Sequence, residues 1–293
     1  MEKKKLTNEE NLFLIASSKT EIFKAKYNGE EVISKKISLE SNDKVLSDFI
    51  KKREITLMSE LCTQNIPNLV KFHGWIEEKS YIKIIMEYLQ GSDLSNFIGD
   101  KITYHLSIKQ KVKILLDIAE GLEFIHRNYV IYRDLKPQNI LINRKITDDT
   151  LDFTAKIIDF GLSKRLRNLN EVDPENDENS TVAANSGTYK YFAPEQSSSD
   201  YDYKVDIYAF ALIAFELFSE KSSYSDKVTK NLNKHNLIMQ IKKGLRPNKH
   251  IKPLEGTPNE ILEMCERNWK EDPEDRQTAC ELIDTMVEIY RKL

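Results

Sequence analysis

Apolar runs in the chain alternate with short polar segments, and two such runs enclose a polar stretch of eight residues. Val130–Ile131 precedes it and residues 140–142 follow it, and both runs are typical of buried strands. The segment 132–139 between them is therefore predicted to be a loop held by the core at both ends. Pro137 stiffens this loop because its ring fixes φ.

The polar residues of this loop suit one kind of chemistry. Asp134 can accept the proton of a hydroxyl group, and Lys136, two residues later, can neutralise a phosphoryl group in transfer. Asn139 can coordinate Mg²⁺ through its amide oxygen, a hard ligand of the type this ion prefers. The combination predicts a phosphoryl-transfer site.

A second apolar run delivers another carboxylate. Residues 156–158 are predicted to form a short buried strand, which ends at Asp159, and Gly161 allows the backbone to turn away. A carboxylate at the end of a strand is a candidate metal ligand, so Asp159 is expected to bind metal together with Asn139.

Helical periodicity marks a buried carboxylate in the first third of the chain. Leu46, Ile50, Glu54 and Met58 recur every four residues, which predicts an amphipathic helix with Glu54 on its apolar face. A carboxylate in that position requires a cation nearby. The alternative is that Glu54 lies at the edge of the face with its carboxylate in water.

Composition limits the classes of partner. The 293 residues are 40% hydrophobic, enough for a large core, and 44 basic against 47 acidic residues give a net charge of −3. This balance does not favour binding to nucleic acid or to an anionic membrane. Three scattered cysteines favour a reducing compartment, and no apolar stretch predicts a signal peptide or a membrane-spanning helix, so a cytoplasmic protein is expected.

Taken in order, these segments resemble the motifs of eukaryotic-type protein kinases. The catalytic-loop pattern H-R-D-x-x-x-x-N is matched with Tyr132 in place of histidine, and the metal-loop pattern D-F-G is matched without change. Further segments resemble G-T-x-x-Y, A-P-E, D-V-W-S-F and the stretch whose arginine pairs with the A-P-E glutamate. These segments are residues 187–191, 193–195, 206–210 and 269–276.

The resemblance implies an α+β fold with two lobes. It places a small β-rich N-lobe with one main helix at residues 12–86, a hinge at 87–91 and a larger helical C-lobe at 92–293, as one catalytic domain. It also implies that Glu54 pairs with a strand lysine that holds the α and β phosphates of ATP. Lys35 fits this role, and Lys36 is the alternative, because a shift of one residue in a strand reverses the face.

The remaining nucleotide contacts follow from the resemblance alone. Backbone atoms of Glu87 and Leu89 are expected to bond adenine after the gatekeeper Met86. Asp93 stands where a polar side chain often meets the ribose, although it is equally suited to open a helix. Three apolar residues complete the predicted nucleotide site, namely Ile15, Ile22 and Leu141.

The chain departs from the family in its phosphate-binding loop. The pattern G-x-G-x-x-G-x-V should fall on residues 15–22, which contain no glycine. Glycines there let the backbone approach the phosphates, so their absence predicts weaker nucleotide binding. A pseudokinase that acts as a binding scaffold is therefore the alternative to an active enzyme.

The resemblance also bears on the substrate and on control. Lys136 and Thr188 stand as in kinases that phosphorylate serine or threonine of proteins, so ATP, Mg²⁺ and a protein substrate are expected, and transfer to a small molecule is disfavoured. Other segments look most like the tyrosine-kinase-like group. Arg133 is the residue with which kinases bind an activation-loop phosphate. Candidate phosphate carriers are Ser180, Thr181 and Ser186, in a stretch that otherwise reads as a solvated acidic loop.

Overall fold

The computed structural model divides the chain into two compact units. One comprises residues 1–90 and 159–161, and the other comprises residues 91–158 and 162–293. The boundary after Gln90 falls within the segment 87–91 predicted as a hinge. The structure describes residues 6–14, 20–39, 44–98, 105–147, 150–166, 188–197, 200–225, 229 and 231–293.

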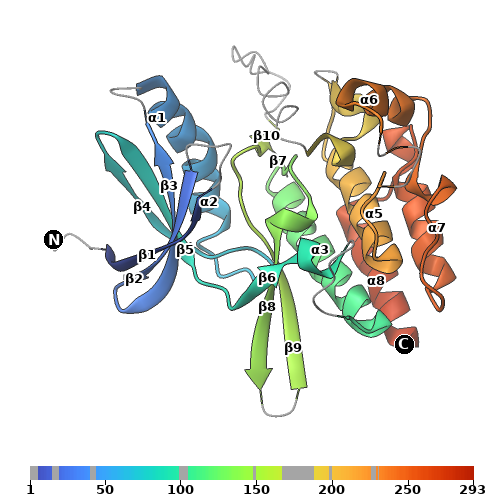
Figure 1. Ribbon diagram of the computed structural model, residues 1–293, viewed down its shortest axis with the longest axis horizontal. Helices are drawn as coiled ribbons and strands as arrows, with labels where there is room; N and C mark the ends of the chain where they lie inside the picture. Colours follow the sequence, from blue (N-terminus) through green and yellow to red (C-terminus); the bar gives the residue numbers. More distant parts are fainter. Residues whose placement is uncertain are drawn as a thin grey trace. The chain divides into compact units, whose positions relative to one another are not determined.

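The first unit is a five-stranded antiparallel sheet with one irregular helix (Figure 1). The strands are β1 (Leu6–Leu14), β2 (Thr20–Tyr27), β3 (Glu30–Ser38), β4 (Phe72–Glu78) and β5 (Tyr81–Glu87), in the order β1-β2-β3-β5-β4. The helical part consists of α1 (Lys44–Ile50), a π-helical turn (Lys51–Ile55) and α2 (Thr56–Leu61). The first strand begins at Leu6, six residues before the predicted start of the lobe.

Local sequence explains the first hairpin. Asn28 and Gly29, between β2 and β3, both have positive φ, 53° and 86°. This is the requirement of the two-residue type I′ turn, which Asn-Gly satisfies best. The turn fixes the register that pairs Ile22 with Lys35. One face of the sheet is closed by a small core of Ala25, Val32 and Ile85.

The second unit is mainly helical. Its helices are α3 (Ile108–Arg127), α5 (Lys204–Ser219), α6 (Lys234–Lys242), α7 (Asn259–Asn268) and α8 (Ala279–Lys292). Its strands are β6 (Gly91–Asp93), β7 (Val130–Ile131), β8 (Ile140–Thr147), β9 (Thr150–Ile157) and β10 (Lys164–Arg165), which form the sheets β6-β8-β9 and β10-β7. The long β8–β9 hairpin and the α3–α8 pair are visible in Figure 1.

The central helix of this unit, α5, is buried along its whole length. Helices α3 and α8 each begin with a capping box, at Ser107 with Gln110 and at Thr278 with Glu281, which satisfies amide groups that a helix start leaves open. Gly91 in β6 has no room for a side chain, because an added Cβ would lie 1.8 Å from the carbonyl oxygen of Ile142. Backbone packing thus requires glycine there.

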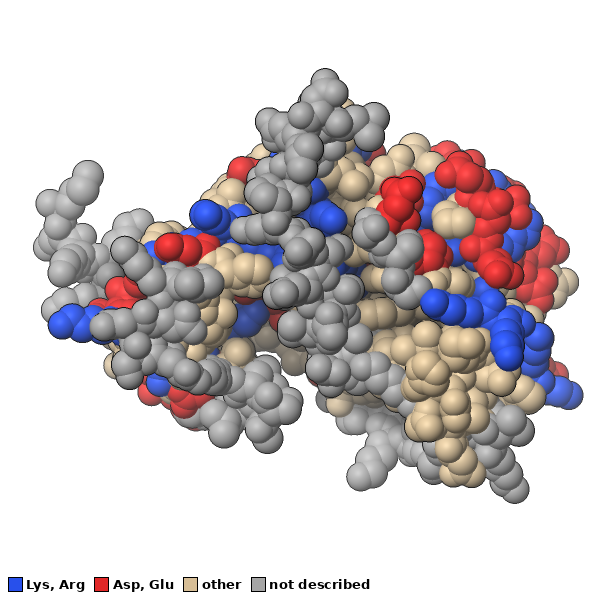
Figure 2. Space-filling view, turned by 90° about the horizontal axis from the view of Figure 1, so that it is seen from above, with Lys and Arg blue, Asp and Glu red and all other residues tan. Residues whose placement is uncertain are grey.

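The surface carries both signs of charge. Basic and acidic side chains lie next to each other on the face seen in Figure 2, in keeping with the net charge of −3. Across the part of the chain that the structure describes, no helix combines the length and the apolar character needed to cross a membrane.

Candidate active site

The loop between β7 and β8 holds a carboxylate in a fixed orientation. Asp134 is 7% exposed, and its Oδ2 lies 2.7 Å from Nζ of Lys136. The same oxygen accepts a hydrogen bond of 2.8 Å from the side-chain amide of Asn139, which also donates to the carbonyl oxygen of Asp134 at 2.9 Å. The three residues predicted to perform phosphoryl transfer on this loop therefore do lie together.

A buried aspartate on α5 anchors the backbone of this loop. Oδ2 of Asp206 accepts a hydrogen bond from the amide of Tyr132 at 2.8 Å, and Oδ1 accepts one from Arg133 at 2.7 Å. Nε2 of His126 lies 2.9 Å from Oδ2. Arg133 has a φ of 72°, so these bonds hold the chain in a conformation that a non-glycine residue rarely adopts.

This role of Asp206 was missed by reasoning from the sequence. A signal was present, because Asp206 opens a helix that is otherwise almost wholly apolar, and a buried carboxylate needs donors. His126, the next-to-last residue of α3, is a partner of the same carboxylate.

Tyr132, which replaces the histidine of the family pattern, is fully buried. Its hydroxyl group donates a hydrogen bond to the carbonyl oxygen of Ile158, the residue before Asp159. The hydroxyl of Ser163 in turn donates to the carbonyl oxygen of Tyr132 at 3.1 Å. Tyrosine thus connects the catalytic loop to the end of the strand that delivers Asp159, through a polar group that would be costly to leave unpaired.

The first unit contains a cluster of one lysine and two carboxylates. Nζ of Lys35 lies 2.7 Å from Oε1 of Glu54 and 2.9 Å from Oδ1 of Asp159. Lys36 points to the other face of β3, where it pairs with Glu21 at 2.5 Å. The pleat of the strand therefore selects Lys35 as the partner of Glu54, and the alternative based on Lys36 is wrong for this ion pair.

The environment shifts the pKa of both members of this pair. Burial alone would lower the pKa of Lys35, but the carboxylates of Asp159 and Glu54 outweigh it and raise the pKa above its usual value of 10.5. Burial raises the pKa of Glu54 above its usual value, against the opposing influence of Lys35. Lys35 is therefore firmly cationic at neutral pH, whereas at Glu54 burial disfavours the charged form and Lys35 favours it.

Asp159 combines an unusual backbone with an accessible side chain. Its φ is 64°, its side chain is 39% exposed, and Oδ1 also accepts a hydrogen bond from the amide of Gly161 at 3.1 Å. A Cβ added at Gly161 would lie 3.2 Å from that oxygen and 3.5 Å from Oε2 of Glu54. The glycine of this motif therefore makes room for two carboxylates.

The two predicted metal ligands are each suited to a divalent cation. Asn139 uses its amide nitrogen within the loop, which directs its oxygen, the atom a hard cation requires, away from Asp134. Asp159 presents an accessible carboxylate, one oxygen of which faces the ammonium group of Lys35. Each donor set fits Mg²⁺ in chemical type, and metal binding by these residues stays a prediction.

The residues predicted to contact the nucleotide base and ribose have defined local positions. Glu87 ends β5, where its side chain accepts a bond of 2.7 Å from the amide of Lys71, and Leu89 is buried. Asp93 caps the turn Leu94–Phe97 by accepting from the amide of Ser95 at 2.9 Å. Asp93 thus has the helix-opening role that the sequence offered as an alternative to ribose binding.

Three further predicted contacts remain to be placed. Leu141 is the register partner of Asp93 in the β6–β8 ladder, and Ile22 is half-buried opposite Lys35 on β2. Ile15 lies outside the described residues, as do most of the glycine-free loop and the candidate phosphate carriers Ser180, Thr181 and Ser186.

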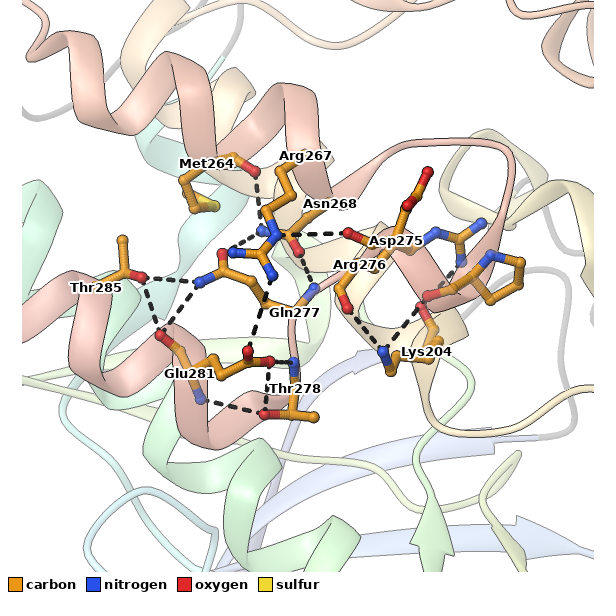
Figure 3. A network of polar contacts seen from close by, with 11 residues as sticks. Lys204, Met264, Arg267, Asn268, Asp275, Arg276, Gln277, Thr278, Glu281 and Thr285 are labelled. Carbon is orange, nitrogen blue, oxygen red and sulfur yellow. Dashed lines mark hydrogen bonds and ion pairs between the residues drawn. The ribbon is translucent and has the colours of Figure 1, made fainter.

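The predicted pair between the A-P-E glutamate and an arginine near the C-terminus is confirmed. Arg276 is fully buried and binds both oxygens of Glu195, at 2.6 and 3.0 Å. Its guanidinium group also donates to the carbonyl oxygens of Lys270, Lys204 and Glu271. Figure 3 shows the polar network around Arg276, in which Gln277 and Asn268 bond each other as well.

Comparison with known proteins agrees with these features. Residues 16–287 match the family model described as the protein kinase domain, and the chain belongs to this family. It is 31% identical over 278 residues to the serine/threonine-protein kinase VIK of Arabidopsis thaliana, covering 93% of this chain and 58% of that protein. It is 33% identical over 224 residues to the human receptor-interacting serine/threonine-protein kinase 1, covering 72% of this chain and 30% of that protein. The chain thus spans 58% of the length of the first relative and 30% of the length of the second.

Proposed function

We propose that this chain is a catalytic domain that transfers the γ-phosphoryl group of ATP to serine or threonine hydroxyls of proteins. The observation that carries this proposal is the orientation of Asp134, whose carboxylate is held by Lys136 and Asn139 on a loop fixed by Asp206. A buried, oriented carboxylate beside a lysine is costly for a fold to maintain and is of use to phosphoryl transfer.

In the proposed reaction the protein contributes mainly orientation and charge. Asp134 accepts a hydrogen bond from the acceptor hydroxyl and takes its proton as the new oxygen–phosphorus bond forms. The bond between the γ-phosphorus and the bridging oxygen breaks in the same step, and ADP leaves. Lys136 balances the negative charge of the transferring group, and Lys35, braced by Glu54, holds the α and β phosphates. Mg²⁺, when bound through Asn139 and Asp159, would neutralise phosphate charge.

The choice of serine and threonine rests on resemblance. Lys136 and Thr188 match the pattern of kinases with that acceptor, and the relatives are named serine/threonine-protein kinases. Membership of the tyrosine-kinase-like group is part of the same proposal.

The first experiment measures transfer of labelled phosphate from Mg-ATP to a generic basic protein and to the chain itself. Asp159→Asn should reduce transfer by about a hundredfold or more, because it removes a metal ligand while asparagine tolerates the positive φ. Asp284→Asn, at an exposed position of α8, is the control and should leave transfer unchanged. Phosphoamino acid analysis of the product identifies the acceptor residue.

The outcome distinguishes an active kinase from a pseudokinase. Absence of transfer by the wild-type chain with Mg²⁺ and with Mn²⁺ would contradict the proposal and favour a pseudokinase scaffold, which the glycine-free loop at residues 15–22 supports. Label on tyrosine alone would contradict the proposed acceptor while leaving the kinase activity in place.

We also propose that phosphate on the activation segment controls the enzyme through Arg133. This side chain is 6% exposed, its guanidinium lies 5.7 Å from the ring centre of Tyr201, and its backbone is tied to Asp206 next to Asp134. A phosphate bound there would act directly on the catalytic loop. Mass spectrometry of active protein should find phosphate on Ser180, Thr181 or Ser186. Full activity of the triple alanine variant would contradict this control.

A further inference from the structure

The helix that carries Glu54 contains a π-helical turn at Lys51–Ile55, with Glu54 inside it. Such turns close a ring with one residue more than an α-helical turn and are uncommon, because the wider turn weakens hydrogen bonding. Their persistence in a short helix therefore requires a compensating contact. The structure supplies it at the residue that follows, Thr56.

Thr56 makes two bonds to one carbonyl group. Its backbone amide is shared between the carbonyl oxygens of Arg53 and of Lys51, which is five residues earlier, and its hydroxyl group donates to the Lys51 oxygen at 2.9 Å. The side chain of Thr56 is exposed, so it contributes nothing to the apolar core. Its hydroxyl group therefore stabilises the wide turn through a local hydrogen bond.

The wide turn explains the spacing of four residues seen in the sequence. In a straight α-helix each step of four residues drifts by about 40°, so Leu46 and Met58 would be about 120° apart. One turn that absorbs an extra residue removes about 100° of this drift. Ile50, Glu54 and Met58, which are 6%, 5% and 0% exposed, thereby share one buried face.

Both ends of the helix are attached to the sheet. In α1 and at the start of the turn, the hydroxyl of Ser47 donates to Glu77 of β4 at 2.7 Å, and Nζ of Lys51 lies 2.5 Å from the same carboxylate. Near the end of the turn, Glu54 meets Lys35 of β3. If the turn tightened to α-helical geometry, the two halves would rotate against each other, and one of these attachments would be lost.

We infer that Thr56 is a positioning residue, whose hydroxyl holds the wide turn that directs Glu54 at Lys35. This inference rests on the proposed function, because Lys35 is the phosphate-binding lysine of that proposal. The hydroxyl of Thr56 bonds the carbonyl oxygen of Lys51 and not the Lys35–Glu54 pair itself. It acts through the helix geometry at Glu54.

The test compares Thr56→Val, which removes the hydroxyl but keeps the shape, with Thr56→Ser, which keeps the hydroxyl. Thr63→Val is the matched control, because Thr63 is also exposed and its hydroxyl donates to a carbonyl oxygen, that of Ser59, at 2.8 Å. That bond spans four residues and lies outside the wide turn. All three variants alter only the surface.

Two readouts are measured on each variant. The first is kcat/KM for ATP, which should fall about fivefold in Thr56→Val, the effect of one ordinary hydrogen bond, and return to the wild-type value in Thr56→Ser. The second is the rate at which an amine-reactive acylating reagent modifies Lys35, followed by mass spectrometry, with Lys36 as the internal reference. If the Lys35–Glu54 ion pair weakens, the rate of acylation of Lys35 should rise by a similar factor, and the rate for Lys36 should stay unchanged.

The acylation rate keeps this inference separate from the proposed function. If the wild-type chain transfers no phosphate, the proposed function fails, and the ratio of Lys35 to Lys36 modification still reports on Glu54. Equal ratios in the wild type and Thr56→Val would overturn the positioning role. An equal increase in Thr63→Val would overturn it too, since any loosening of the helix would then suffice.

Discussion

The Glu195–Arg276 pair and the Lys35–Glu54 pair are both withdrawn from water, and they differ in how completely their charges are satisfied. Arg276 uses its planar group to bind both oxygens of Glu195 and three carbonyl oxygens. Lys35 instead divides one ammonium group between Glu54 and the accessible Asp159. The first arrangement leaves little room for a further ligand, whereas the ammonium group of the second is the one proposed to bind the phosphates.

The difference teaches which pair serves the fold and which serves the proposed chemistry. A fork of five donors fixes geometry, and replacing any partner leaves buried groups unpaired. The ammonium group of Lys35 has a raised pKa and therefore stays charged. It faces Glu54, whose own pKa is raised by burial, so the charge of this partner is less firmly held. Substitution should therefore harm stability at the first pair and activity at the second.

The largest expected effect on stability comes from Arg276→Met. It should lower the free energy of unfolding by about 3–5 kcal/mol, because Glu195 and three carbonyl oxygens lose their donor. Urea unfolding measures this change. Arg267→Met is the control, because the Arg267 side chain is about half exposed and its ion pair with Glu281 is long, at 3.8 Å. It should change the free energy of unfolding by no more than about 0.5 kcal/mol. Equal losses in the two variants would remove the distinction between the pairs.

Lys35→Met should reverse the pattern. Phosphoryl transfer should fall by about a hundredfold or more, because the phosphates lose their cation. The free energy of unfolding should fall by only about 1–2 kcal/mol, since the stranded Glu54 can take up a proton. Steady-state kinetics and urea unfolding are compared with those of Lys36→Met. Lys36 forms a half-buried pair with Glu21 on the other face of β3, and its loss should change transfer and stability little. Similar losses of transfer in the two variants would contradict the selection of Lys35.

The pH dependence should separate activity from stability. Burial raises the pKa of Glu54, so as pH falls this residue takes up a proton in the folded state before an ordinary glutamate would, and the pair with Lys35 weakens. Activity should fall on the acid side above the ordinary glutamate pKa of 4.5. The fold gains rather than loses from this protonation, because the folded state binds the proton more tightly than the unfolded chain.

Lys35 determines the alkaline side of the dependence of stability on pH. Its folded pKa is raised, so its contribution to stability is complete below the unfolded value of 10.5 and is lost as pH rises beyond it. Rate profiles and unfolding midpoints between about pH 4 and 11 measure the acid limb and the beginning of the alkaline limb. Parallel loss of activity and stability on the acid side would contradict the assignment to Glu54.

The smallest expected effect is that of Tyr132→Phe. It removes only the hydroxyl that bonds the carbonyl oxygen of Ile158, so unfolding should become easier by about 1 kcal/mol and transfer should change little. Thermal unfolding measures the change. A loss of transfer as large as that of Lys35→Met would show that this hydroxyl takes part in orienting Asp159.

Part of the site could be predicted because its residues are close in sequence. Asp134, Lys136 and Asn139 occupy one turn of a loop between two buried strands, so local pattern sufficed to place them together. Asp159 followed from the end of a strand in the same way. The bonds of Asp206 to the loop could not be predicted in this way, since they join residues more than seventy positions apart.

What the sequence determined by itself is therefore local: strands, turns, the order of motifs and the chemical types available. Asn28-Gly29 specified a hairpin, and the spacing of four from Leu46 to Met58 specified a buried face. The tertiary structure decided between Lys35 and Lys36, because adjacent strand residues differ only in the face they present. It also decided the wide turn before Thr56, since the cost of such a turn is offset by the Thr56 hydroxyl and by the attachments of the helix to the sheet.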